Sequence, residues 1–186
     1  STKGALIKRI TMPYPADSKE ELLELVRANL TSKTKMILLS HVETVTGLRW
    51  PIKEVSELIR GRDILFIVDG AQAPGMFHID LQDLGCDVYA CSGHKWIMGP
   101  KETGILYLRQ GIQDRVNNVF IAGGYDVYSA SSGTRNAPII IGFGDVIDWH
   151  MALGTSRIER HCMKLAKYCY SELKKIKSIK IISPDD

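Results

Sequence analysis

The chain has 186 residues and lacks the features that mark several protein classes. No run of about 18 apolar residues occurs, so no membrane span is expected. The four cysteines form no C-x-x-C pair, which disfavours a zinc site and predicts free thiols. The formal net charge is only +3, which gives no support for a nucleic-acid partner.

Two further absences concern how the chain begins. The first ten residues include three basic side chains but no long apolar core, unlike a signal peptide, and we therefore expect a cytoplasmic protein. The chain does not start with methionine, so we expect it to be part of a longer protein.

Apolar runs and helix signals alternate along the first two thirds of the chain. The Ser18–Glu21 spacing predicts a capped helix over residues 17–30, and Pro51 opens a second helical segment. Continuous apolar runs predict buried strands, covered on both faces, at residues 35–40, 64–68, 87–91 and 104–108. This alternation predicts an α/β fold with a mostly parallel sheet.

The last third of the sequence favours helices. Residues 138–153 and 155–177 have helical patterns, and residues 179–182 suggest another strand. The second helix carries an apolar stripe that we expect to be buried, consisting of Ile158, Cys162, Leu165, Cys169, Leu173 and Ile176. Its other face is basic and fits solvent exposure better than nucleic-acid binding, because aromatic residues are not interleaved with the charges. A nucleotide-binding enzyme is also disfavoured, since the sequence has no Walker loop.

Polar residues follow three of the predicted strands. Thr44 comes shortly after the first strand, Asp69 and Gln72 follow the second, and Ser92, His94 and Lys95 follow the third. Ligands bind beyond the carboxyl ends of the strands in an open parallel sheet. A lysine beside a carboxylate at such an edge indicates an imine-forming site.

The segments VDGAQAPG, SGHKW and GPK resemble, in order and spacing, the class V aminotransferases. These are pyridoxal-phosphate enzymes with the aspartate-aminotransferase type of fold. The resemblance extends from about residue 35 to the C-terminus. It implies the three-layer α/β large domain over residues 1–153, with residues 154–186 as a linking helix and the start of a small α+β domain.

The resemblance also implies roles for individual residues. Lys95 matches the catalytic lysine that forms an aldimine with pyridoxal 5'-phosphate and later moves the proton at the substrate's α-carbon. Asp69 matches the carboxylate that pairs with the pyridine nitrogen, which makes the ring an electron sink. Gln72 and Thr44 match ligands of the ring's phenolic oxygen.

Phosphate ligands are implied as well. Ser92 and His94 match residues that hydrogen-bond the cofactor phosphate. Gly133 and Thr134 resemble a pair that reaches the phosphate of a neighbouring subunit, which implies a homodimer with a shared active site. His41 does not match the ring-stacking residue, and we interpret it as packing.

The sequence departs from the family pattern in two ways. Glu102 replaces a glycine that commonly follows the GPK segment, which would cost on the order of 1 kcal/mol if the backbone there has a positive φ. Several family parts have no match in this chain: the upstream phosphate turn, the ring-stacking group, the arginine for the substrate carboxylate and the reactive cysteine of desulfurases. Cys86 and Cys91 do not match that cysteine.

The sequence therefore predicts a pyridoxal-phosphate enzyme that acts on an amino acid. Trp96, after the lysine, resembles the isopenicillin N epimerase-like branch. A cysteine desulfurase or selenocysteine lyase is the nearest alternative, followed by an aminotransferase. A non-catalytic or dimerisation module is the alternative of a different class, although Lys95 and Asp69 are both retained.

Overall fold

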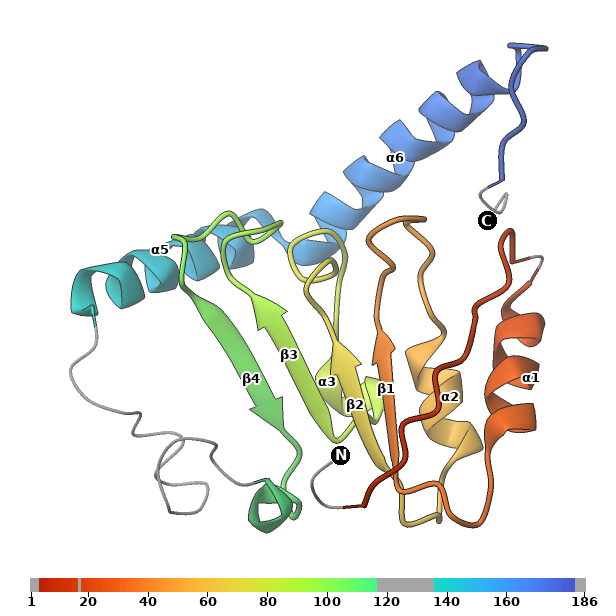
Figure 1. Ribbon diagram of the computed structural model, residues 1–186. Coiled ribbons are helices and arrows are strands. Elements are labelled where there is room, and N and C mark those ends of the chain that lie inside the picture. Colours follow the sequence, from red (N-terminus) through yellow and green to blue (C-terminus); the bar gives the residue numbers. More distant parts are fainter. Residues whose placement is uncertain (1–3, 17, 117–135, 183–186) are drawn as a thin grey trace.

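A four-stranded sheet forms the centre of the computed structural model, which describes residues 4–16, 18–116 and 136–182 (Figure 1). The strands lie in the order β1 (Met36–Ser40), β2 (Leu65–Asp69), β3 (Val88–Ser92) and β4 (Gly104–Leu108). The first three are parallel to their neighbours, whereas β4 runs antiparallel to β3. The predicted α/β fold with a mostly parallel sheet is confirmed.

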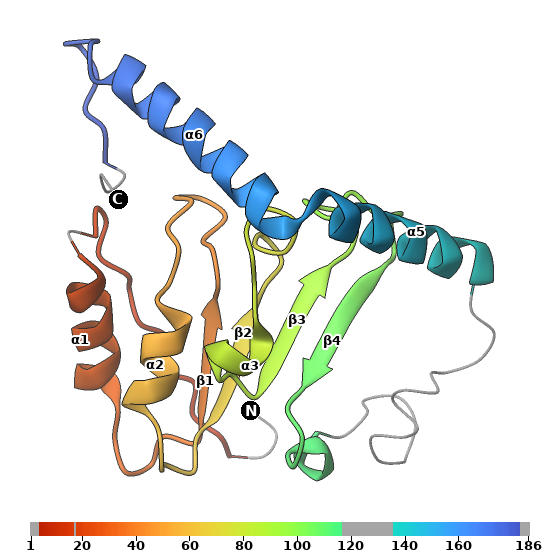
Figure 2. The ribbon, with the colours of Figure 1, turned by 180° about the vertical axis from the view of Figure 1, so that it is seen from behind.

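Three helices cover one face of this sheet (Figure 2). They are α1 (Lys19–Asn29), α2 (Ile52–Leu58) and the short α3 (Leu81–Leu84). The predicted cap of α1 is present, because the Ser18 hydroxyl accepts a hydrogen bond from the Glu21 amide at 3.1 Å. Helix α3 was not predicted, although Asp80 caps its start and Gly85 ends it in the left-handed conformation.

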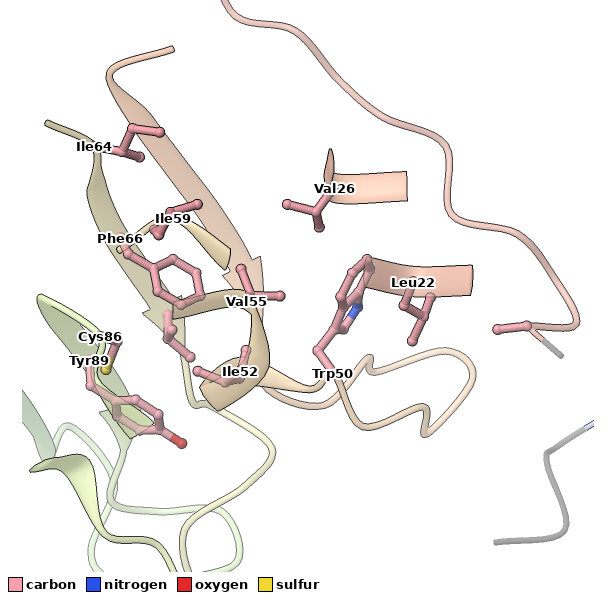
Figure 3. Close-up of a cluster of buried hydrophobic side chains, with 12 residues drawn as sticks. Leu22, Val26, Trp50, Ile52, Val55, Ile59, Ile64, Phe66, Cys86 and Tyr89 are labelled. Carbon is pink, nitrogen blue, oxygen red and sulfur yellow. The ribbon is translucent and has the colours of Figure 1, made fainter. Parts of the chain in front are cut away.

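The main core lies between these helices and the sheet (Figure 3). Phe66 and Val68 of β2 are 1% and 0% exposed, and Ile52 and Val55 of α2 lie in the same cluster. Leu22 of α1 closes the cluster on its outer side. Burying several large apolar side chains is worth about 1.5–3 kcal/mol each, so this face holds the sheet in place.

The opposite face of the sheet is largely open, contrary to the prediction of strands covered on both faces. Met36 and Leu38 of β1 are 56% and 65% exposed. The described cover on this face is a small cluster around Leu65, Val88 and Ile112, next to the 3-10 helix Gln113–Arg115. Apolar runs report which side chains favour burial, and they do not say which segment buries them.

Two long helices follow the sheet. Helix α5 (Ala137–Leu153) runs along one end of the sheet, and α6 (Thr155–Leu173) projects away from it (Figure 1). The prediction of a buried stripe on α6 is wrong within the described residues: no residue of the helix is buried, and Leu165 is 55% exposed. Residues 179–182 form no strand. Among the described helices, none has the length and apolar character needed to cross a membrane.

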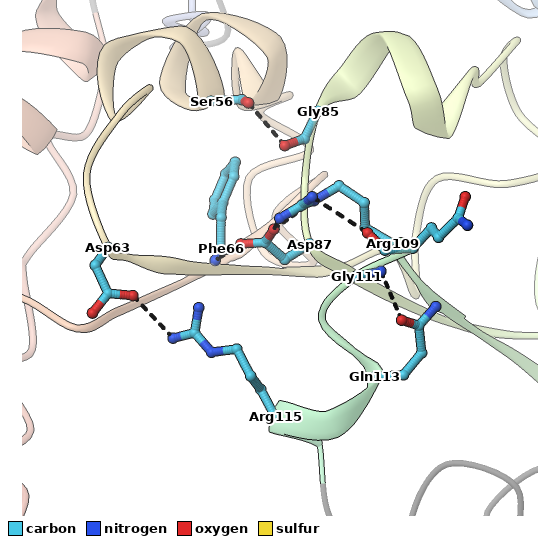
Figure 4. Close-up of polar contacts among 10 residues, drawn as sticks. Ser56, Asp63, Phe66, Gly85, Asp87, Arg109, Gly111, Gln113 and Arg115 are labelled. Atoms are coloured by element: carbon cyan, nitrogen blue, oxygen red, sulfur yellow. Dashed lines mark hydrogen bonds and ion pairs between the residues drawn. The ribbon is translucent and has the colours of Figure 1, made fainter.

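A buried carboxylate ties three strands together at the end of the sheet opposite to the predicted site (Figure 4). Asp87, immediately before β3, accepts a hydrogen bond from the Phe66 amide of β2 at 2.8 Å. It also accepts from Arg109, which directly follows β4, at 2.8 Å through Nε and 2.7 Å through the second guanidinium nitrogen. Asp87 is 8% exposed, so solvent cannot readily replace these partners.

We predict that Asp87→Ala lowers the free energy of unfolding by about 2–3 kcal/mol, because it leaves the buried Phe66 amide without its acceptor and Arg109 without its counter-ion. Urea denaturation followed by circular dichroism measures the loss. Asp83→Ala is the matched control, since Asp83 pairs with Lys53 on the surface, and a cost of at most about 1 kcal/mol is expected. Equal losses in the two variants would contradict a structural role for Asp87.

Candidate functional site at the carboxyl edge of the sheet

The loops after β1, β2 and β3 begin side by side because strand pairing continues one residue beyond the sheet. The His41 amide donates to the Asp69 carbonyl at 2.7 Å, and the Gly70 amide donates to the Ala90 carbonyl at 2.7 Å. These bonds align the starts of three loops that carry the residues singled out from the sequence. The expected gathering of Thr44, Asp69, Gln72 and Lys95 at one edge therefore has a backbone cause.

Asp69 and Ser92 lie on the open face of the sheet. Asp69 is paired in register with Ala90, and Ser92 is two residues further along β3, so their side chains share a face. The Asp69 side chain is exposed, and its Oδ1 accepts a hydrogen bond from the Ala71 amide at 2.9 Å. One carboxylate oxygen is thereby held by the backbone.

Thr44, Gln72 and Trp96 form a hydrogen-bonded row across the three loops. The Gln72 amide nitrogen donates to Thr44 Oγ1 at 3.1 Å, and the Trp96 indole nitrogen donates to the Gln72 amide oxygen at 3.0 Å. The sequence predicted Thr44 and Gln72 as neighbours of one ligand atom, and the structure brings them into direct contact. The role of Trp96 was missed, because no spacing rule links an indole to an amide 24 residues earlier.

Lys95 lies in the turn between β3 and β4, which is held together by its own backbone hydrogen bonds. The Gly93 amide donates to the Thr103 carbonyl and the Gly99 amide donates to the Gly93 carbonyl, both at 2.8 Å. A Cβ on Gly93 would lie 2.7 Å from the ring of Phe143 in α5, so the turn also packs against that helix. Lys95 is half-buried within the turn, and His94 is exposed.

The same turn contains two residues with strained backbone. Glu102 has φ of 68° and Met98 has φ of 63°, both in the left-handed region. Glu102 therefore carries the expected conformational strain of a non-glycine residue in this region, about 1 kcal/mol. The antiparallel pairing of Gly104 with Ser92 starts two residues later, so the strained turn still delivers β4 in register.

His41 is a packing residue, as predicted from the sequence. It is 1% exposed, its Nδ1 lies 2.9 Å from the Tyr89 hydroxyl, and its ring meets that of Phe77 edge-on. Burial, with a smaller contribution from the Arg49 charge, lowers the pKa of His41 to about 4. Gly70 makes room for this contact, because a Cβ there would lie 2.1 Å from the Tyr89 ring.

The two cysteines of the sheet are poorly suited to nucleophilic chemistry. Burial raises the pKa of Cys86 to about 11 and also raises the pKa of Cys91. The thiolate is the reactive form of cysteine, so neither thiol is activated. This agrees with the absence of a sequence match between these residues and the desulfurase cysteine.

Two other regions contribute nothing to the site as described. Gly133 and Thr134 lie outside the described residues. A hollow of about 620 Å³ between α1 and α2, lined by Trp50 and one side of His41, contains none of the residues predicted to bind the cofactor. The site is therefore defined by the convergence of side chains at the sheet edge.

The comparisons with known proteins identify the family. The chain matches the aminotransferase class-V family over residues 2–186 and belongs to that family. It is 29% identical over 202 residues to isopenicillin N epimerase of Amycolatopsis lactamdurans, covering 98% of this chain and 51% of that protein. It is 31% identical over 175 residues to a probable cysteine desulfurase of Halalkalibacterium halodurans, covering 87% of this chain and 43% of the relative.

Solved structures agree on the fold. The apo cysteine desulfurase of Thermococcus onnurineus NA1 superposes with a TM-score of 0.72 at 24% identity, covering 90% of this chain and 44% of that chain. The cystine C-S lyase C-DES, solved with cysteine persulfide, has a TM-score of 0.64 at 26% identity, covering 72% and 40%. Another structure of C-DES has glycine covalently linked to its pyridoxal-phosphate cofactor. Enzymes of this class use pyridoxal phosphate. The chain spans about half the length of the curated relatives it matches.

We predict that His41 makes stability depend on pH between about 6.5 and 4. The folded protein keeps His41 neutral, whereas the unfolded chain binds a proton below pH 6.5, so its contribution is full above that pH and is lost as pH falls toward 4. Between pH 7 and 4 the wild type should lose about 3 kcal/mol more than His41→Gln.

Chemical denaturation at a series of pH values measures this difference. His161→Gln, on the exposed surface of α6, is the control and should retain the wild-type pH dependence. Parallel curves for the wild type and His41→Gln would rule out a buried neutral imidazole.

Proposed function

We propose that this chain forms the cofactor-binding part of a pyridoxal-phosphate enzyme acting on an amino acid. The observation that carries the proposal is the placement, at one sheet edge, of the loops that carry Lys95, Asp69 and the hydrogen-bonded pair Thr44 and Gln72. Membership of the class-V family supports the same reading.

The donor set fits the cofactor. Asp69 offers a carboxylate for the pyridine nitrogen, and the amide and hydroxyl of Gln72 and Thr44 suit the ring's phenolic oxygen. Ser92 and His94 are the candidate phosphate ligands, since a dianion needs several donors. Thr134 is proposed to reach the phosphate of a second subunit, so the working form would be a homodimer with a shared active site.

Pyridoxal phosphate supplies, when bound, an aldehyde for a lysine amine and a ring that withdraws electrons from the bonds of the substrate's α-carbon. Lys95 holds the cofactor through its amine and then takes or returns the proton at the α-carbon. Asp69 keeps the ring nitrogen protonated through its negative charge. Ala71 and the neighbouring strand fix the carboxylate for that task.

The extent and setting of the enzyme are part of the proposal. Residues 1–153 belong to the cofactor-binding large domain, and residues 154–186 lead into the small domain. The exposed apolar face of α6 is consistent with a helix that links two domains. We propose a cytoplasmic enzyme that uses no nucleic acid or membrane partner.

For the reaction, an isopenicillin N epimerase-like activity is favoured by Trp96 after the lysine and by the 29% identity to that enzyme. Cysteine desulfuration is the second candidate, supported by the 31% identical probable desulfurase. The buried, unactivated Cys86 and Cys91 mean that a desulfurase would need its reactive thiol elsewhere. Racemisation assays and sulfide release from cysteine distinguish the two.

We predict that Lys95→Ala abolishes turnover of an amino-acid panel while leaving the circular dichroism spectrum unchanged. The reason is that the amine of Lys95, a half-buried residue, is proposed to carry the proton transfer, and no packing contact of its side chain is described. The assay uses the longest natural form of the chain. Lys101→Ala, in the same turn but exposed, is the matched control and should keep normal activity.

Asp69→Asn tests the proposed role of Asp69 separately from that of Lys95. This variant should still bind the cofactor but lose most of its kcat, because the amide cannot hold the ring nitrogen protonated. Near-normal turnover in Lys95→Ala would defeat the assignment, and an unchanged kcat in Asp69→Asn would remove Asp69 from its role.

A further inference from the structure

The hydrogen bonds of Trp96, Gln72 and Thr44 have a single direction. An indole N–H can only donate, so the Gln72 oxygen must face Trp96. The amide NH₂ group must then face Thr44, whose hydroxyl oxygen accepts from it. Side-chain amides are often ambiguous in orientation, but a donor-only neighbour removes the ambiguity here.

The row therefore ends in a donor. Thr44 uses a lone pair to accept from Gln72, and its own hydroxyl hydrogen is available to donate onward. The Gln72 NH₂ group also has a second hydrogen, which the bond to Thr44 does not use. Hydrogen bonds in a chain polarise one another, so each donor is strengthened by the one before it. An acceptor oxygen, and above all an anionic one, is the ligand atom that suits such a row.

The backbone around Trp96 is held from two sides. Gly75, with φ of 95°, approaches so closely that a Cβ would lie 2.3 Å from the Trp96 carbonyl oxygen. The buried His150 of α5 donates from Nε2 to the Ile97 carbonyl at 2.9 Å. Trp96 itself is 47% exposed, so its ring contributes little to the core.

We propose that Trp96 is a positioning residue of the cofactor site: its indole N–H fixes the Gln72 amide so that Gln72 and Thr44 present hydrogens to the cofactor's phenolic oxygen. This inference rests on the proposed function. Without the indole, the Gln72 amide is free to turn, and its oxygen would then face an anionic oxygen. The hydrogen bonds from Gln72 and Thr44 therefore favour the deprotonated form of the phenolic oxygen and lower its proton affinity.

The test uses Trp96→Phe, which keeps an aromatic ring and removes the N–H. In the longest natural form of the chain, the variant should bind pyridoxal phosphate several-fold more weakly. The pH midpoint of the bound cofactor's visible absorption should rise by roughly 0.5–1 unit, because the donors no longer stabilise the negative oxygen. Trp149→Phe is the control, since that side chain is similarly exposed at 49% and lies on α5. It should shift neither quantity.

A double-mutant cycle separates positioning from a general structural effect. In a Gln72→Met background, Trp96→Phe should cause no further shift of the midpoint, because the amide it orients is gone. An equal shift in both backgrounds, or no shift in the wild-type background, would overturn the proposal.

A cofactor-free readout tests the hydrogen bond directly. In ¹H–¹⁵N NMR spectra of the apo protein, Gln72→Met should move the Trp96 indole N–H signal upfield and speed its exchange with solvent. An unmoved signal would contradict the row. If the wild type binds no cofactor, the proposed function fails and this inference with it. If the wild type binds but Trp96→Phe behaves as wild type, only the inference on Trp96 fails.

Discussion

The parallel pairing of β1, β2 and β3 is the constraint on which the site depends. Its last backbone hydrogen bonds, from His41 to Asp69 and from Gly70 to Ala90, bring three polar loops to the same edge. Side chains 28 and 24 residues apart in the sequence then meet in hydrogen bonds. The hydrogen bonds of Asp87 with Phe66 and Arg109 join β2, β3 and β4 at the other end of the sheet, so the pairing of β2 with β3 is held at both ends.

Much of this arrangement could be predicted from the sequence because it follows from local rules. Apolar runs gave four strands within one residue of their observed starts, and Ser18 marked the beginning of α1. The strand-end rule predicted that the loops of Thr44, Asp69, Gln72 and Lys95 share one edge, and the structure places Thr44 and Gln72 in contact there. Glu102 was recognised as a departure from a glycine position, and its φ of 68° shows that this position does need a left-handed backbone.

Other features depend on partners that sequence patterns do not encode. The apolar face of β1 and the stripe of α6 have the composition of buried surfaces, yet Leu38 and Leu165 are exposed in the described residues. Trp96 was noticed only as a family marker, because its contact with Gln72 requires both loops to be folded.

The proposed function requires the amine of Lys95 to be the attachment point of the cofactor. The most direct measurement is to incubate the longest natural form of the chain with pyridoxal phosphate, reduce with borohydride and map the modified peptide by mass spectrometry. We expect one pyridoxyl group, on Lys95. A folded protein that carries no adduct, or carries it on a surface lysine such as Lys101, would rule out Lys95 as the attachment point.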